Sequence, residues 1–185
     1  MLSLAKKGAE VTGVDFSQEQ VRLGKISARE CGVDVDLLQA DCHDLSGIIP
    51  GSSFDLAVAE EGVFSWIEDL SSWMRSTYRV LREGGCLLVS DHHPITSCLT
   101  TDEEGEPRFN SSYLDHRPRI MDNEDAPQAT VFLWKISDIV NAALEAGFLI
   151  QHMDEFSDPG AETLAPKYFL LVAKKANRSQ MADGE

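Results

Sequence analysis

The hydrophobic and polar residues of this chain follow two different periods along its length. Short apolar runs with the character of strands occupy residues 10–15, 35–40, 54–59, 86–90, 148–156 and 167–174. Apolar residues recur at helical spacing over residues 17–31, 69–82 and 137–146. The order of these elements predicts an α/β fold: a doubly wound, mostly parallel sheet with helices on both faces.

The ends of several elements can also be read from the sequence. Ser17 is the expected N-cap of the first helix, with Gln20 as its capping-box partner. Gly32 is expected to end that helix. The pair Gly84–Gly85 predicts the end of the second helix. The last two strands follow each other without a helix between them, which predicts an antiparallel hairpin at the C-terminal edge of the sheet.

One segment interrupts this alternation. Residues 96–133 are rich in Asp, Glu, Pro, Asn and Ser, and they predict an inserted, partly irregular cap rather than a second domain. The domain is expected to span residues 1–175, and residues 176–185 are expected to form a disordered tail.

Composition narrows the classes of protein further. The 185 residues include 31 acidic and 16 basic ones, a net charge of −15, which argues against a nucleic-acid partner. No apolar run is long enough to span a membrane, and no signal peptide is seen, so we expect a cytoplasmic protein. The four cysteines show no C-x-x-C spacing or histidine cluster, so we expect reduced thiols and no metal site.

Acidic side chains follow four successive strands. They are joined by two histidines, and the full set is Asp15, Asp41, Glu60, Glu61, Asp91, His92 and His93. In open α/β sheets, ligands bind beyond the carboxyl ends of the strands, so these side chains mark the expected site.

Two of these acids have a specific binding role open to them. Asp15 could accept hydrogen bonds from both hydroxyls of a ribose, or it could cap the following helix. Asp41 could accept from an exocyclic adenine amine while the backbone N–H of Cys42 pairs with a ring nitrogen, or it could be an ordinary loop residue.

Four motifs in this order and spacing resemble those of the class I S-adenosylmethionine-dependent methyltransferases. They are Gly8–Ser17 (GAEVTGVDFS), Gln39–Leu45 (QADCHDL), Ser53–Val58 (SFDLAV) and Tyr78–Gly85 (YRVLREGG). The resemblance covers residues 4–173 and implies a Rossmann-like domain that binds S-adenosylmethionine and methylates a small molecule. Residues 61–70, 91–94 and 134–148 resemble an uncharacterised bacterial and archaeal branch of this family.

The resemblance assigns roles to individual residues. It implies cofactor contacts from Asp15, Phe16, Asp41, Cys42, His43 and Glu60. It implies substrate contacts from Glu61, Tyr113 and Trp134, although each aromatic residue could instead belong to the core. His92 or His93 could serve as the base that some acceptors need, or could orient a loop or pack under the cap.

The sequence departs from the family at one point. The family's first strand and its G-x-G-x-G loop should precede Ala5, but the chain begins at Met1. Without that strand, its neighbours lose hydrogen-bond partners at a cost of about 1–3 kcal/mol per buried group. We expect a truncated domain with impaired activity, unless another segment fills the gap.

Two other functions stay open at this point. An NAD(P)-dependent oxidoreductase also has an acid after its second strand, but no tyrosine here is followed by a lysine four residues later. A degenerate methyltransferase fold could act as a non-enzymatic, partner-binding protein. A homodimer is compatible with the sequence.

Overall fold

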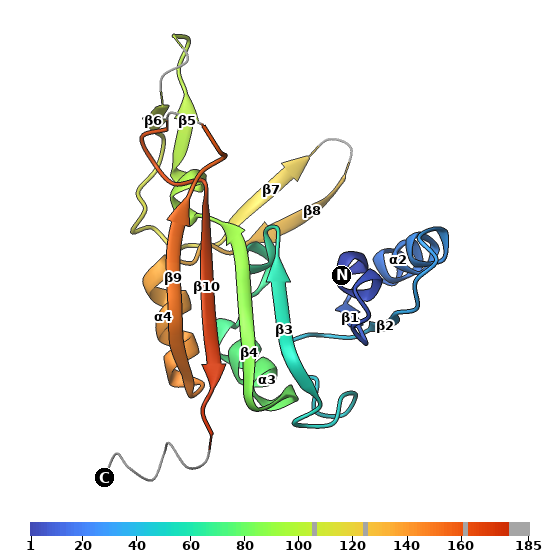
Figure 1. Cartoon of the computed structure of the whole chain (residues 1–185). Coiled ribbons are helices and arrows are strands. Elements are labelled where there is room, and N and C mark those ends of the chain that lie inside the picture. Colours follow the sequence, from blue (N-terminus) through green and yellow to red (C-terminus); the bar gives the residue numbers. More distant parts are fainter. Residues whose placement is uncertain (105–106, 124–125, 161–162, 178–185) are drawn as a thin grey trace, which may run out of the picture. The chain divides into compact units, whose positions relative to one another are not determined.

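The computed structural model describes residues 1–104, 107–123, 126–160 and 163–177 (Figure 1). The chain divides into two units, Met1–Pro50 and Gly51–Glu185, and each is described by itself. No helix within the described ranges is long and apolar enough to cross a bilayer.

The first unit is a strand–helix–strand crossover preceded by a short helix. Its elements are α1 (Leu2–Lys6), β1 (Thr12–Asp15), α2 (Gln18–Glu30) and β2 (Asp36–Gln39), and β1 and β2 pair in parallel. The predicted cap of α2 is confirmed, because Ser17 Oγ accepts a hydrogen bond from the backbone N–H of Gln20 at 3.3 Å. Gly32, just past the end of α2, has φ +65°, a conformation that glycine adopts readily.

The helix and strand of this unit pack closely at one glycine. A Cβ atom added at Gly24 would lie 2.8 Å from Leu37 Cδ1, so a larger residue there would require the Leu37 side chain to shift. Val21 and Ala28, on the same helix, are buried. The two strand ends are therefore held side by side, with Asp15 opposite Gln39 in the ladder.

The second unit is built on a four-stranded sheet with the order β3-β4-β10-β9 (Figure 1). Its strands are β3 (Phe54–Glu60), β4 (Leu81–His92), β9 (Phe148–Phe156) and β10 (Tyr168–Lys175). β3 and β4 are parallel, whereas β10 runs antiparallel to both β4 and β9. The predicted antiparallel hairpin at the sheet edge is confirmed. At the opposite edge, the outer side of β3 has no strand partner among the described residues.

Two helices, α3 (Leu70–Val80) and α4 (Ile136–Glu145), pack against each other and against this sheet. Burial alternates along β4: Leu87 and Val89 are fully buried, whereas Leu88 is partly exposed. Within this unit, both helices therefore cover the same face of the sheet. The largest fully buried side chains are Phe148, Phe169, Met74, Leu81, Leu87, Ile139, Leu171 and Val89.

The glycine pair after α3 has a different role from the predicted one. The helix ends at Val80, and Gly84–Gly85 lies inside β4. The β3–β4 register shifts here, because Phe54 pairs with Leu81 but Leu56 pairs with Cys86. The prediction that the pair stops the helix was wrong: the glycines allow β4 to bulge close to the backbone of β3.

The cap contains more regular structure than its composition predicted. Two antiparallel hairpins follow the short 3₁₀ helix η2 (Pro94–Cys98): β5 (Leu99–Thr101) with β6 (Pro107–Phe109), and β7 (Arg119–Asn123) with β8 (Ala126–Val131). At the other end of the predicted domain, Ala176 is buried. The rest of the predicted tail, from residue 178, lies outside the described residues.

Candidate functional site

Asp15 ends β1 and turns the chain into α2. Its Oδ1 accepts a hydrogen bond from the backbone N–H of Ser17 at 2.8 Å, so the helix-start role considered for this residue is present. No hydrogen bond to its Oδ2 is found within the described residues. Phe16 follows and is 72% exposed. Its backbone carbonyl accepts a hydrogen bond from Gln39 Nε2 at 3.2 Å. This end of β1 therefore presents a carboxylate oxygen and an aromatic ring together.

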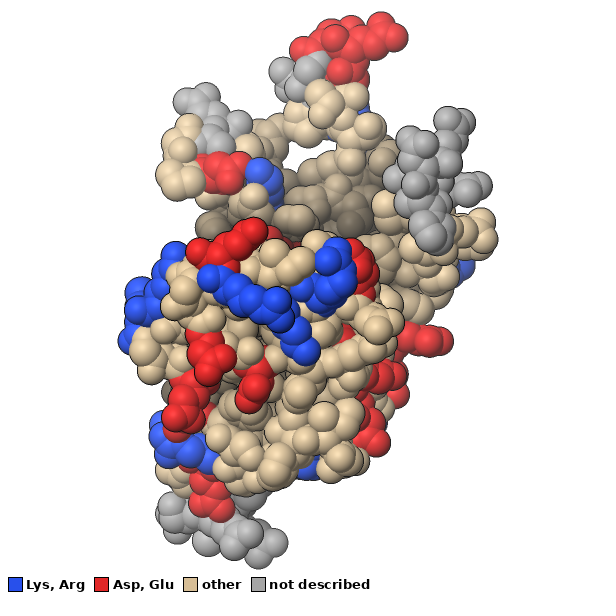
Figure 2. Space-filling view, turned by 90° about the vertical axis from the view of Figure 1, so that its right-hand side faces the viewer, with Lys and Arg blue, Asp and Glu red and all other residues tan. Residues whose placement is uncertain are grey.

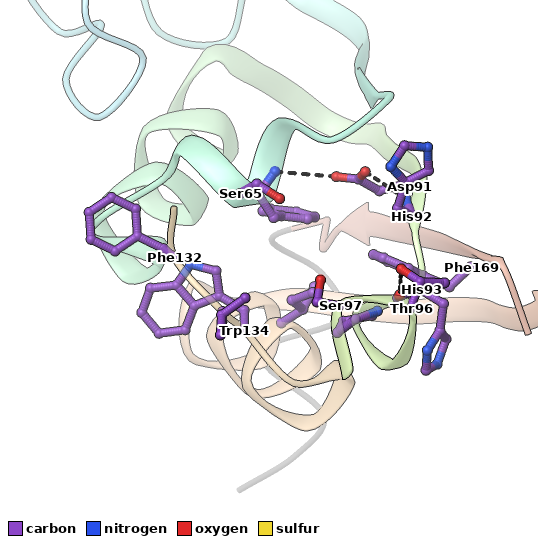
Figure 3. A pocket seen from close by; sticks show the side chains of 13 residues that line it. Ser65, Asp91, His92, His93, Thr96, Ser97, Phe132, Trp134 and Phe169 are labelled. Carbon is purple, nitrogen blue, oxygen red and sulfur yellow. Dashed lines mark hydrogen bonds between the residues drawn. The ribbon is translucent and has the colours of Figure 1, made fainter. Parts of the chain in front are cut away.

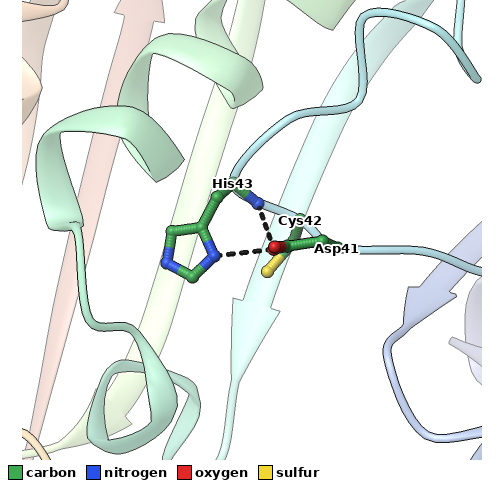
Figure 4. Close-up of side chains that lie close together, drawn as sticks. All are labelled: Asp41, Cys42 and His43. Carbon is green, nitrogen blue, oxygen red and sulfur yellow. Dashed lines mark hydrogen bonds and ion pairs between the residues drawn. The ribbon is translucent and has the colours of Figure 1, made fainter.

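Asp41 lies just past the end of the neighbouring strand. Ala40 N–H donates to the carbonyl of Asp15 at 3.0 Å, which brings the two strand ends together. Asp41 Oδ1 accepts from the backbone N–H of His43 at 2.9 Å and lies 2.6 Å from His43 Nδ1 (Figure 4). These hydrogen bonds, the backbone one first, hold the pKa of the Asp41 carboxyl below its ordinary value.

Cys42 lies between these two residues, and its thiol turns toward them (Figure 4). One potential ligand atom from each of Asp41, Cys42 and His43 lies within 4.8 Å of the others. The sequence did not predict a metal site here. The carboxylate and the imidazole already contact each other, so an ion would have to separate them.

In the second unit, the chain after β3 makes a tight turn. Glu61 has φ +61° and Gly62 has φ +88°, two successive residues in the left-handed region. The turn leads into the 3₁₀ helix η1 (Val63–Trp66), which is tied to the end of the cap. Phe132 N–H donates to Ser65 O at 3.0 Å, and the indole of Trp134 donates to Ile67 O at 2.8 Å.

A pocket of about 260 Å³ opens at the ends of β3 and β4. It is lined by Glu60, Glu61, Ser90, Asp91, His92, Phe156 and Tyr168. Three of these residues form a row across the sheet, because Tyr168 is opposite His92 on one side and Phe156 on the other. Their ring centroids are 5.6 Å apart at each step. Strand alternation alone did not reveal Tyr168 and Phe156 as site residues, since finding them requires the register of the hairpin.

The two adjacent histidines have different surroundings. His93 is 5% exposed, its Nδ1 accepts from Ile95 N–H at 3.0 Å, and its Nε2 lies 2.5 Å from Glu155 Oε1. Because Nδ1 accepts, Nε2 carries the proton and donates to the carboxylate. His93 therefore orients η2, the alternative considered for this residue. His92 is exposed, and no hydrogen bond to its ring is found in the part of the chain that the structure describes.

A smaller cavity of about 90 Å³ lies beneath the cap (Figure 3). Its lining includes Ser65, Thr96, Trp134 and Phe169. Tyr113 does not line either pocket: its ring stacks on His93, with centroids 6.4 Å apart, and its hydroxyl oxygen accepts from the N–H of Ile136 at 3.0 Å. Tyr113 thus joins η2 to the start of α4, and its predicted substrate contact stays a prediction.

Comparison with known proteins bears on the family. Residues 1–89 match the family model described as "Methyltransferase domain". The structure is similar to an S-adenosylmethionine-dependent methyltransferase from Mesorhizobium loti, with a TM-score of 0.71 and 27% identity, over 89% of this chain and 80% of that one. In sequence and in fold, the chain is similar to the class I S-adenosylmethionine-dependent methyltransferases. A putative methyltransferase from Listeria monocytogenes shares the fold, with a TM-score of 0.71 and 17% identity over 91% of this chain and 80% of that one.

Curated relatives match this chain over part of their length. A ubiquinone biosynthesis O-methyltransferase from Methylobacterium sp. (strain 4-46) is 37% identical over 87 residues, which are 47% of this chain and 34% of that protein. An uncharacterized methyltransferase from Bacillus subtilis is 26% identical over 159 residues, 80% of this chain and 60% of that protein. The chain therefore spans from about a third to 60% of these two relatives.

The displayed surface of the chain mixes charges of both signs (Figure 2). Figure 2 shows that Lys and Arg side chains are bordered by Asp and Glu side chains on the displayed face. On α2, for example, Arg22 and Glu19 form an ion pair at 2.6 Å. The absence of a nucleic-acid partner stays a prediction.

Proposed function

We propose that this chain transfers the methyl group of S-adenosylmethionine to a small-molecule acceptor. The observation that carries the proposal is the pair of acids at the neighbouring ends of β1 and β2. Asp15 and Asp41 each fix one carboxylate oxygen on the backbone N–H two residues later. Each has an Oδ2 without a hydrogen bond among the described residues, which is the arrangement that a nucleoside with donor groups would fit.

These residues would hold the two ends of the adenosine group. Asp15 would accept from the ribose hydroxyls, with the exposed ring of Phe16 beside it. Asp41 would accept from the adenine amine, with the N–H of Cys42 toward a ring nitrogen and His43 fixing the Asp41 carboxylate. The roles are compatible with the observed turns, because neither requires the Oδ1 contacts to break.

When bound, S-adenosylmethionine supplies a methyl group attached to a sulfonium. The leaving group is a neutral thioether, so its departure needs no acid. The protein's main task is then to align the acceptor, which is catalysis by proximity and orientation. Of the two histidines, His92 is the one placed to take a proton from an acceptor, because its exposed ring lines the larger pocket. Glu60 lines the same pocket, and its contact with the cofactor stays a prediction.

The acceptor would bind in the second unit. Glu61 lines the larger pocket there, and Trp134 lines the smaller cavity. Acceptor-only carboxylates and aromatic rings suit an organic molecule with donor groups better than a polyanion. A small-molecule acceptor is therefore the proposed partner. The homodimer, the cytoplasmic location and the absence of a membrane partner stay predictions.

Calorimetric titration with S-adenosylhomocysteine tests this proposal. Asp15→Asn keeps an oxygen for the Ser17 N–H but removes the charge and one acceptor, so we expect about 10- to 100-fold weaker binding. Asp36→Asn, an exposed acid on β2, is the matched control and should bind as the unchanged chain does. Binding of NADH instead would support the oxidoreductase, and binding of neither would support a non-enzymatic role.

A further inference from the structure

Asp91 is a buried carboxylate to which the proposed chemistry gives no task. It lies near the end of β4 and is 3% exposed. Its Oδ1 accepts from the N–H groups of Gly62 and of His92, the latter at 2.6 Å, and its Oδ2 accepts from the N–H of Phe64 at 3.2 Å. No Lys or Arg pairs with it within the described residues. Backbone dipoles therefore compensate its burial.

Asp91 binds the turn at residues 61–64, whose backbone is strained and makes few other contacts there. Two successive residues with positive φ, Glu61 and Gly62, cost free energy that the surroundings must offset, since Glu61 has a Cβ atom. Glu61 N–H donates to Ser90 O at 3.2 Å, and the farther end of the segment is tied to the cap through Ser65 O. The Asp91 carboxylate is the contact between these two attachments (Figure 3).

This segment lies between the two pockets. Glu61 lines the larger one, whereas Phe64 lines the smaller one, and Asp91 and His92 line both. We propose that Asp91 is a positioning residue: its carboxylate fixes the turn after β3, and with it the wall between the two pockets. This inference rests on the proposed function for its meaning, but the geometry it asserts can be tested separately.

A carboxylate suits this position because it only accepts hydrogen bonds. Asn has one oxygen and one NH₂ group, so an Asp91→Asn side chain would point a donor at the N–H of either Gly62 or Phe64. The turn would then open more often, while the sheet and the two helices would keep their packing. Local opening without global unfolding is therefore the result that a positioning role predicts.

Hydrogen exchange of the full chain, measured peptide by peptide, tests the inference. We expect Asp91→Asn to speed exchange in the peptide covering 61–66 by about 10- to 100-fold, with β4, β10 and α3 unchanged. Asp154→Asn is the matched control, because Asp154 is exposed and, within the described residues, accepts only from the next residue, Glu155. Unchanged exchange at 61–66, or an equal rise throughout the sheet, would overturn the inference.

Two further measurements keep the result interpretable. In the unchanged chain, NMR couplings across hydrogen bonds should link the amide nitrogens of Gly62 and Phe64 to the Asp91 carboxylate carbon, and their absence would overturn the inference even if the variant does not fold. Calorimetric titration of the unchanged chain with S-adenosylhomocysteine tests the proposed function separately from this geometry. If the unchanged chain does not bind this ligand, the proposed function fails, and the exchange and coupling results still decide the geometry.

Discussion

Replacing Gly85 with alanine places a methyl group against the backbone of β3 and of β4 itself. The added Cβ would lie 2.9 Å from Arg82 O, 3.1 Å from Phe54 O and 3.2 Å from Asp55 O. All three atoms belong to the backbone, so no side chain can rotate to relieve the contacts. Relief requires the backbone of the bulge to shift within β4 and away from β3, which lengthens ladder hydrogen bonds in the core of the second unit.

The size of the effect follows from these contacts. Overpacking by one methylene costs about 1–3 kcal/mol, and the rigid surroundings of Gly85 favour the upper half of that range. A chain of this length loses about 2–4 °C of melting temperature per kcal/mol. We therefore expect Gly85→Ala to lower the melting temperature of the second unit by about 4–12 °C.

Tryptophan fluorescence is the appropriate assay, because Trp66, Trp73 and Trp134 all lie in the second unit. Gly51→Ala is the matched control, because the atom nearest to the new Cβ would lie 3.5 Å away, an ordinary contact. The free energy of unfolding of this variant should change by less than about 0.5 kcal/mol. If the free energy of unfolding of Gly85→Ala also changes by less than that margin, the explanation that Gly85 is needed for a close backbone approach is refuted.

Three further changes test other contacts. Lys175 Nζ donates to the carbonyls at the end of α3, so Lys175→Met should cost about 1–3 kcal/mol in urea unfolding, with Lys174→Met nearly neutral. Trp134→Phe removes the donor to Ile67 O and should cost about 1–3 kcal/mol, measured by circular dichroism. Because the folded-state pKa of Asp41 is lowered, its contribution is present above about pH 4 and is lost as the pH falls through the lowered pKa. The stability difference between the unchanged chain and Asp41→Asn should therefore shrink in acid, and a constant difference would contradict it.

Local signals in the sequence were sufficient for much of the fold. Ser17 and Gly32 set the ends of α2 through contacts within a few residues, which is why they could be predicted. The hairpin of β9 and β10 followed from two long apolar runs without a helix between them. The cap hairpins could not be predicted, because short strands such as β5 and β6 have exposed residues on both faces and hence no alternation.

The candidate site shows a similar division. The acids at strand ends, such as Asp15 and Asp41, were predictable from the position of each strand. The separate roles of His92 and His93 were not, since they depend on partners from β9 and β10 that are about 60 or more residues away along the chain. Tyr168 reached the pocket through register alone, and no local pattern marks it.

Within the described residues, no strand is paired with the outer side of β3, and this has a consequence for handling the protein. An edge strand with free backbone groups is a template on which a second copy can pair, and Leu56 and Val58 on this strand are 42% and 40% exposed. At neutral pH the net charge of −15 keeps copies apart, but this repulsion vanishes near the isoelectric point of about 4.6. Mild acid should therefore drive the chains to aggregate through β3 before acid unfolds them.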